Sequence, residues 1–114
     1  MHIYNYSHPV TTEQPAQISS MFSTEVKAED ITDIPVQIDH SLPMMPQIKA
    51  MLPTDERGSS TERIWIIPPG YSVAAAVLVV ELLHEYGGFV HLLRTRPVPG
   101  STPTRYELAE VIVL

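Results

Sequence analysis

Apolar and polar residues follow one another in blocks, and the spacing inside each block indicates a strand or a helix. Runs rich in β-branched and aromatic residues predict strands over residues 2–6, 34–38, 63–67, 89–98 and 105–114. Apolar residues at helical spacing predict helices over about residues 12–22, 44–52 and 73–86. Strands and helices therefore alternate until the last two strands, which follow each other directly.

Prolines, glycines and polar clusters mark the ends of these segments. Pro35 inside the second predicted strand indicates an edge strand or the start of a strand, because proline has no amide hydrogen to donate to a neighbour. Ser72 is expected to cap the longest helix, and Gly87 follows its last turn. The polar residues 53–62 are expected to form a surface loop, and the short connection over residues 99–104 predicts an antiparallel hairpin.

This order of segments predicts a single α/β domain over residues 1–114. Alternating strands and helices are typical of a mostly parallel sheet between layers of helices, here with one antiparallel strand at its C-terminal end. Within the predicted strand over 63–67, residues 64–67 are apolar without alternation, which is typical of a strand covered on both faces. A chain of 114 residues has the size of one hydrophobic core.

The charge and the residue usage exclude several classes of protein. Thirteen acidic and seven basic residues give a net charge of −6, whereas proteins that bind duplex DNA normally carry a basic surface. Cysteine is absent, which excludes disulfides and fits a reducing cytoplasm. The first residues do not resemble a signal peptide, and the longest apolar run is shorter than the ~20 residues of a membrane span. We therefore expect a cytoplasmic protein with neither duplex DNA nor a membrane as partner.

Polar residues gather where the predicted parallel strands end. Ligands bind beyond the carboxyl ends of the strands in open parallel sheets, so the candidate site is expected there. Its members are Ser7 and His8 after the first strand, Asp39 and His40 after the second, Pro69, Gly70, Tyr71 and Ser72 after the third, and Arg94 and Arg96 late in the fourth.

Two of these groups are candidate anion sites. Gly70 leaves room for a ligand, and Ser72 with the first amides of the following helix would face it; a capped helix after an ordinary turn is the alternative. Arg94 and Arg96 are two residues apart on a strand, so both guanidinium groups are expected to face the same way. Their partners would be neighbouring phosphates or, alternatively, acidic side chains in salt bridges.

The histidines supply the candidate acid–base chemistry. His8 or His40 would serve as a general acid or base near neutral pH, with ordinary hydrogen bonds in the loops as the alternative. Asp39 would either orient His40 or cap the next segment. His84 and His91 are expected to be structural. We expect neither a metal site nor a cofactor, and no hydrolase motif is present.

Several motifs together resemble one small CRISPR-associated family. They are Ser-His-Pro after the first strand, Thr-x-Glu-Gln at 11–14, Ile-Pro-Val-Gln-Ile-Asp-His at 34–40, Pro-Pro-Gly-Tyr-Ser at 68–72 and, most specifically, Arg-Pro-Val-Pro-Gly-Ser-Thr-Pro at 96–103. The chain resembles the Csx-fifteen family of type III CRISPR loci, which is similar to ring nucleases and to sensor domains of the Rossmann-like (CARF-like) fold. The resemblance covers most of the chain and weakens over residues 53–62.

The resemblance implies a Rossmann-like three-layer domain that binds cyclic tetra-adenylate, the second messenger of type III CRISPR systems. It implies phosphate contacts from Ser7, His8, Gly70, Tyr71, Ser72, Arg94 and Arg96. It also implies that walls around the adenines come from Asp39, His40 and the loop of Pro99, Gly100, Ser101 and Thr102.

Three functions remain open at this point. The candidate loops contain no lysine, so we expect a sponge that binds the messenger and lowers its free concentration. A slow, metal-independent ring nuclease is the first alternative, and a dimeric structural subunit that binds no nucleotide is the second. The small chain and its apolar helix predict a homodimer whose two copies share the ligand platform. Larger assembly driven by the ligand is left open.

Overall fold

The fold alternates strands and helices and ends in a hairpin. The structure is a computed structural model that describes residues 2–8, 14–23, 25–53, 63–87 and 90–114. Within these residues the elements are β1 (Ile3–Asn5), α1 (Gln14–Phe22), a 3₁₀ turn (Ala28–Asp30), β2 (Ile31–Asp33), α2 (Met44–Ala50), β3 (Ile64–Ile67), α3 (Ser72–Tyr86), β4 (Val90–Pro97) and β5 (Tyr106–Val113).

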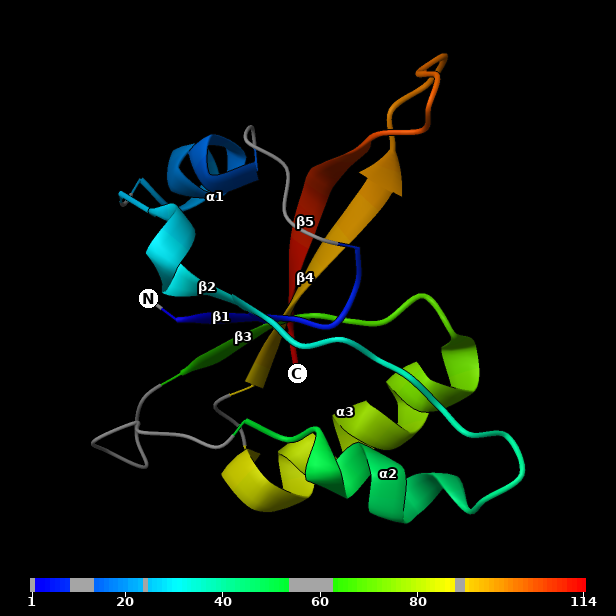
Figure 1. The fold of residues 1–114 in the computed structure, drawn as a ribbon. Helices are drawn as coiled ribbons and strands as arrows, with labels where there is room; N and C mark the ends of the chain where they lie inside the picture. The colour runs from blue at the N-terminus through cyan, green and yellow to red at the C-terminus, as the bar shows by residue number, and fades with distance from the viewer. Residues whose placement is uncertain (1, 9–13, 24, 54–62, 88–89) are drawn as a thin grey trace.

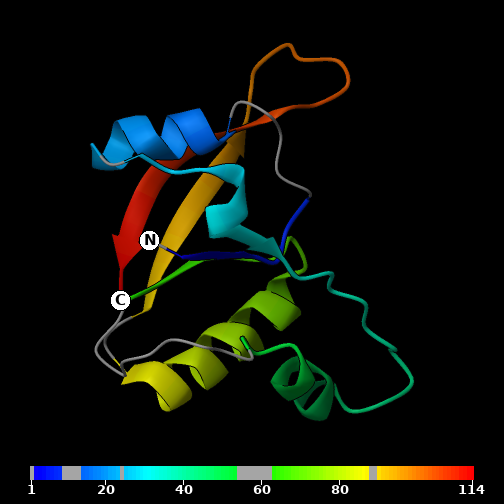
Figure 2. The ribbon, with the colours of Figure 1, turned by 60° about the vertical axis from the view of Figure 1, so that its left-hand side comes forward.

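The strands form one mixed sheet in the order β2-β1-β3-β4-β5. β1 runs parallel to both β2 and β3, and β3 runs parallel to β4. β5 runs antiparallel to β4, and their hairpin extends beyond the rest of the sheet (Figures 1 and 2). The mostly parallel sheet with an antiparallel C-terminal strand is therefore confirmed.

Helices cover both faces of this sheet, so the fold has three layers. α1 lies on one face, and α2 and α3 lie together on the other (Figures 1 and 2). Alternate residues of β1 enter different cores: Ile3 packs with Ile18 of α1, whereas Tyr4 packs with Leu78 of α3. β3 contributes to both cores, as its unbroken apolar sequence predicts. The predicted three-layer, Rossmann-like α/β fold class is confirmed.

The second strand does not lie where the sequence predicted it. We expected residues 34–38, but β2 is Ile31–Asp33. The amide of Ile34 donates to the carbonyl of Asn5 at 2.8 Å, and Pro35 follows with no amide hydrogen, so the pairing ends there. Ile34 and Val36 are apolar because they pack against the core under α2 and α3. β2 does lie at the edge of the sheet, but Pro35 lies beyond its last residue and not within it.

The predicted cap of the longest helix is also wrong by one residue. α3 begins at Ser72, and the preceding residue, Tyr71, takes the cap position without a side-chain hydrogen bond. Gly87 ends the helix with a φ of +62°, a conformation that favours glycine. The expected helix start at Thr12, the loop over 54–62 and the strand start at Phe89 lie outside the described residues. In the described part of the chain, no helix has the length and apolar character to cross a membrane.

Candidate functional site

A cavity of about 380 Å³ lies at the carboxyl ends of β1 and β3, beside the β4–β5 hairpin. Its volume falls in the range of about 300–1,000 Å³ that is usual for small-molecule sites. We call it the main cavity. It is lined by Asn5, Ser7, His8, Gln14, Ile67, Thr95, Thr104, Arg105 and Tyr106.

A smaller space of about 240 Å³ adjoins the main cavity, and we call it the side hollow. The rings of His8 and Tyr106 stack with their centroids 5.3 Å apart, and both residues line both spaces. The aromatic pair therefore stands between the two, and together they form the strand-end site. The side hollow is lined by Ser7, His8, Pro68, Pro69, Gly70, Arg94, Thr95 and Tyr106.

Asn5 holds the loop that carries Ser7 and His8. Its side chain is 2% exposed, and its Nδ2 donates to the carbonyl of His8 at 2.7 Å and to Oδ1 of Asp33 at 2.8 Å. Its Oδ1 accepts the amide of Ser7 at 3.0 Å. A buried amide that makes three hydrogen bonds fixes the backbone around it, so the position of His8 depends on Asn5.

The turn before α3 brings Gly70 to the side hollow and leaves the start of the helix open. A Cβ built on Gly70 would meet no atom within 4 Å, so packing inside the protein does not require a glycine there. No side chain caps the first turn of α3, and such first-turn amides favour an anionic group. Tyr71 lines a neighbouring hollow of about 240 Å³ together with Ser7, His8 and Gly70.

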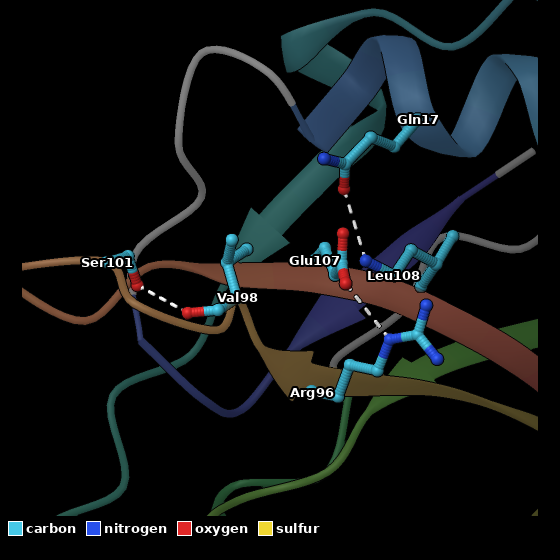
Figure 3. A network of polar contacts seen from close by, with 6 residues as sticks. All are labelled: Gln17, Arg96, Val98, Ser101, Glu107 and Leu108. Carbon is cyan, nitrogen blue, oxygen red and sulfur yellow. Dashed lines mark hydrogen bonds and ion pairs between the residues drawn. The ribbon is translucent and has the colours of Figure 1, made fainter.

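The two candidate arginines are held in salt bridges to β5. Nε of Arg94 lies 2.6 Å from Oε1 of Glu110, and Nε of Arg96 lies 3.0 Å from Oε1 of Glu107 (Figure 3 for the second pair). This is the alternative that the sequence left open. Arg94 also lines the side hollow, whereas Arg96 lines neither space of the strand-end site. The structure thus separates two residues that the sequence treated as a pair.

Asp39 and His40 lie outside the strand-end site. The carboxylate of Asp39 accepts both the amide and the hydroxyl of Ser41, at 2.9 and 2.6 Å, and these two bonds hold the pKa of Asp39 below its usual value. Asp39 therefore stabilises the turn in which it lies. Gln47 of α2 also holds this turn, because its side chain accepts the amide of Asp39 and donates to the carbonyl of Asp39. The ring centroids of His40 and Tyr71 are 5.6 Å apart, so His40 contacts a residue of the neighbouring hollow and not of the strand-end site.

The loop over residues 100–102 lies in the hairpin and lines neither space. The hydroxyl of Ser101 donates to the carbonyl of Val98 at 2.7 Å (Figure 3) and accepts the amide of Arg105 at 2.9 Å. Gly100 has a φ of +73°, which suits glycine in a tight turn. Gly100, Ser101 and Thr102 thus shape the hairpin, and Thr104 and Arg105, which follow after Pro103, line the main cavity.

Sequence reasoning missed seven lining residues of the main cavity: Asn5, Gln14, Ile67, Thr95, Thr104, Arg105 and Tyr106. Asn5 offered a signal, since it is a polar residue inside a strand-forming run just before the strand's carboxyl end. Thr95 and Tyr106 offered none, because their places follow from the register of β4 and β5, in which Tyr106 faces Pro97.

A second hollow lies away from the strand ends. It has about 430 Å³ and lies between the start of β1, β2 and the end of α2, where His2 and Thr32 form its polar rim. Nε2 of His2 and the hydroxyl of Thr32 are 2.9 Å apart. No group of three His, Asp or Glu side chains among the described residues is placed to hold a metal ion.

The comparisons with known proteins give the site no precedent. No protein-family model matches the chain. No curated protein and no solved structure matches it either.

Proposed function

We propose that the chain binds cyclic tetra-adenylate at the strand-end site and sequesters it, which lowers the messenger that reaches its effectors. The observation that carries the proposal is the pair of adjoining spaces at the carboxyl ends of the parallel strands, divided by the His8–Tyr106 stack. The location rests on this geometry. The choice of ligand rests on the motifs that resemble the Csx-fifteen family.

The main cavity is the part that we assign to an adenine base. Bases stack on aromatic side chains, and each such contact contributes about 1–3 kcal/mol to binding. The rings of His8 and Tyr106 offer such a surface, and Thr95 and Thr104 are polar residues in the same lining. A nucleobase, with flat faces and a polar edge, matches this lining.

The side hollow is the part that we assign to a phosphate. Arg94 brings a positive charge to its wall, and the uncapped start of α3 directs backbone amides toward the same end of the sheet. Glu110 competes for Arg94, so a phosphate would have to replace or share that salt bridge. A cyclic ligand with repeated units can present a base to one space and a phosphate to the other, and its other half can bind a second copy of the chain.

Sequestration fits the site better than cleavage does. Opening the ring needs the ribose 2′-hydroxyl in line with its phosphate and a base beside it. His8 is the one imidazole among the lining residues of both spaces. In the described part of the chain its ring stacks on Tyr106 and pairs with no carboxylate that would orient it. The ring nuclease that uses His8 is the second candidate.

The test is a calorimetric titration with cyclic tetra-adenylate, followed by chromatography of the recovered ligand. The proposal predicts saturable binding and recovery of the intact ring. Linear products formed over many turnovers would replace the sponge with a ring nuclease. The absence of binding would leave the structural subunit.

A further inference from the structure

β5 lies at the edge of the sheet, with β4 on one side and, among the described residues, no strand on the other. It is eight residues long, whereas the opposite edge strand, β2, has three. An edge strand presents unpaired amide and carbonyl groups to a further strand unless something covers them. The question is which of these groups on β5 remain available.

Two observations fix which amides of β5 point outward. The amide of Val98 donates to the carbonyl of Arg105, so this pair is hydrogen-bonded, and bonded and non-bonded pairs alternate along the antiparallel ladder. Leu108, opposite Thr95, then belongs to a non-bonded pair and points its amide away from β4. That amide indeed donates to Oε1 of Gln17 on α1 at 3.1 Å (Figure 3).

The same alternation identifies the outward groups beyond Leu108. The register shifts between Arg94 and Thr95, where β5 carries one extra residue. β4 itself is regular, so the backbone amides and carbonyls of Arg94 and Leu92 point toward β5. Those of Leu93 and His91 point away from it. Their partners Val111 and Val113 therefore point their amides and carbonyls outward.

The outer end of β5 is also apolar and exposed. Gln17 satisfies the amide of Leu108, but Val113 is 70% exposed and Leu114 is 41% exposed. Residues 111–114 are Val-Ile-Val-Leu and carry no side-chain charge. A bare edge of this composition favours pairing with another strand.

We propose that a second copy of this chain pairs with this edge, antiparallel to β5 and related by a two-fold axis at Ile112. The amide of Val111 donates to the carbonyl of the partner's Val113, and the carbonyl of Val111 accepts the amide of the partner's Val113. The two-fold axis repeats both bonds between Val113 and the partner's Val111. The two Ile112 side chains then lie opposite each other. Because both bonded residues point outward in one chain, the same edge complements itself, as a two-fold interface requires.

Charge favours a second copy as the occupant. In this register Glu110 faces the partner's Leu114, so no side-chain carboxylate of one copy faces a side-chain carboxylate of the other. Glu110 is also neutralised within its own chain by Arg94 at 2.6 Å. Two copies with a net charge of −6 each therefore meet along their uncharged segment.

This dimer does not rest on the proposed ligand. The strand-end sites of its two copies face opposite directions, because the two-fold axis reverses the strands. Each site would therefore bind ligand separately, unlike the shared platform that the sequence led us to expect, and the dimer should form without ligand.

The test compares Val113→Pro with Val113→Thr by sedimentation equilibrium at micromolar concentrations without ligand. Proline removes one outward amide and is tolerated where the amide faces solvent on an edge, whereas threonine keeps the amide. Wild-type protein and Val113→Thr should reach the dimer mass, and Val113→Pro should stay monomeric with unchanged circular dichroism. A monomeric wild-type protein, or a dimeric Val113→Pro variant, would overturn the proposal.

Amide hydrogen exchange in the wild-type protein tests the same contact without a variant. The amides of Val111 and Val113 should exchange more slowly at high protein concentration than at low concentration, while that of Leu108 stays constant. Equal exchange of Val111 and Val113 at both concentrations would also overturn the proposal, even if a dimer forms through another surface.

Discussion

At the scale of single residues, Asn5 connects the fold to the site. Its buried side chain bonds the loop after β1 at Ser7 and His8 and reaches Asp33 on β2. Asn5→Ala removes these bonds and leaves buried groups unpaired, which should lower the free energy of unfolding by about 1–3 kcal/mol. Denaturant unfolding measures this change. Thr32→Ala, at a more exposed position of β2, is the control, and an equal loss in both variants would contradict the role of Asn5.

The two arginines offer a matched pair for the phosphate assignment. Both form a salt bridge from β4 to β5, but Arg94 alone of the two lines the side hollow. Arg94→Ala should weaken binding of cyclic tetra-adenylate by about 1.5–3 kcal/mol, as for the loss of a charge-assisted hydrogen bond. Arg96→Ala should leave the affinity nearly unchanged. Calorimetry on both variants decides, and equal affinities in the two would remove Arg94 from the site.

His8 distinguishes holding the ligand from cleaving it. In a sponge, His8→Ala removes half of the aromatic stack and should weaken binding by about 1–3 kcal/mol, with the ligand still recovered intact. In a nuclease, the loss of a general base should slow turnover by about 10²–10⁴-fold while binding survives. His84→Ala, at an exposed position near the end of α3, is the control. Loss of turnover in His8→Ala alone would contradict the sponge.

At the scale of elements, the sequence predicted α1, α2 and α3 and the strands β1, β3, β4 and β5, but it placed the remaining strand, β2, at the wrong residues and did not predict the 3₁₀ turn. The apolar periodicity of α3 and the unbroken run of β3 were sufficient, because both segments lie in the core. β2 was misplaced because residues 34–38 are apolar for packing and not for pairing, while Pro35 ends the ladder. The spacing of apolar residues predicts which segments are buried. It does not predict which buried segment also forms hydrogen bonds with a neighbouring strand.

Tyr6 ties the end of β1 to α2, and this tie predicts a pH dependence. Its hydroxyl donates to the carbonyl of Met51 at 2.7 Å, and burial, with a smaller effect of Tyr86 and Tyr4, raises the pKa of Tyr6 above 10.0. The folded state therefore favours the neutral phenol. Its contribution to stability is complete below pH 10.0 and is lost as the pH rises from there toward the folded pKa.

Tyr6→Phe tests this contribution. At neutral pH the variant should lose about 0.5–1.5 kcal/mol of unfolding free energy with the hydrogen bond to Met51. Above pH 10.0 it should lose stability less steeply than the wild-type protein, because it has no phenol to ionise. Denaturant unfolding across this range measures both slopes. Parallel curves for the two proteins would contradict the role given to Tyr6.

At the scale of the whole molecule, the sequence predicted where a site would form better than it predicted its members. The rule that ligands bind at the carboxyl ends of parallel strands located Ser7, His8, Gly70 and Arg94, which the structure brings together. It also included Asp39 and His40, which the long extended segment after β2 carries outside the site. Tyr106 enters the site because it faces Pro97 in the hairpin, a pairing that no local pattern in the sequence indicates.

The most direct test of the central claim is to map the bound ligand on the ¹⁵N-labelled chain by NMR. Cyclic tetra-adenylate should shift the amide signals of Ser7, His8, Gly70 and Tyr106, which surround the two spaces of the strand-end site. The signals of His2 and Thr32 at the second hollow should stay unchanged. Shifts confined to the second hollow, or no shifts at saturating ligand, would contradict the account.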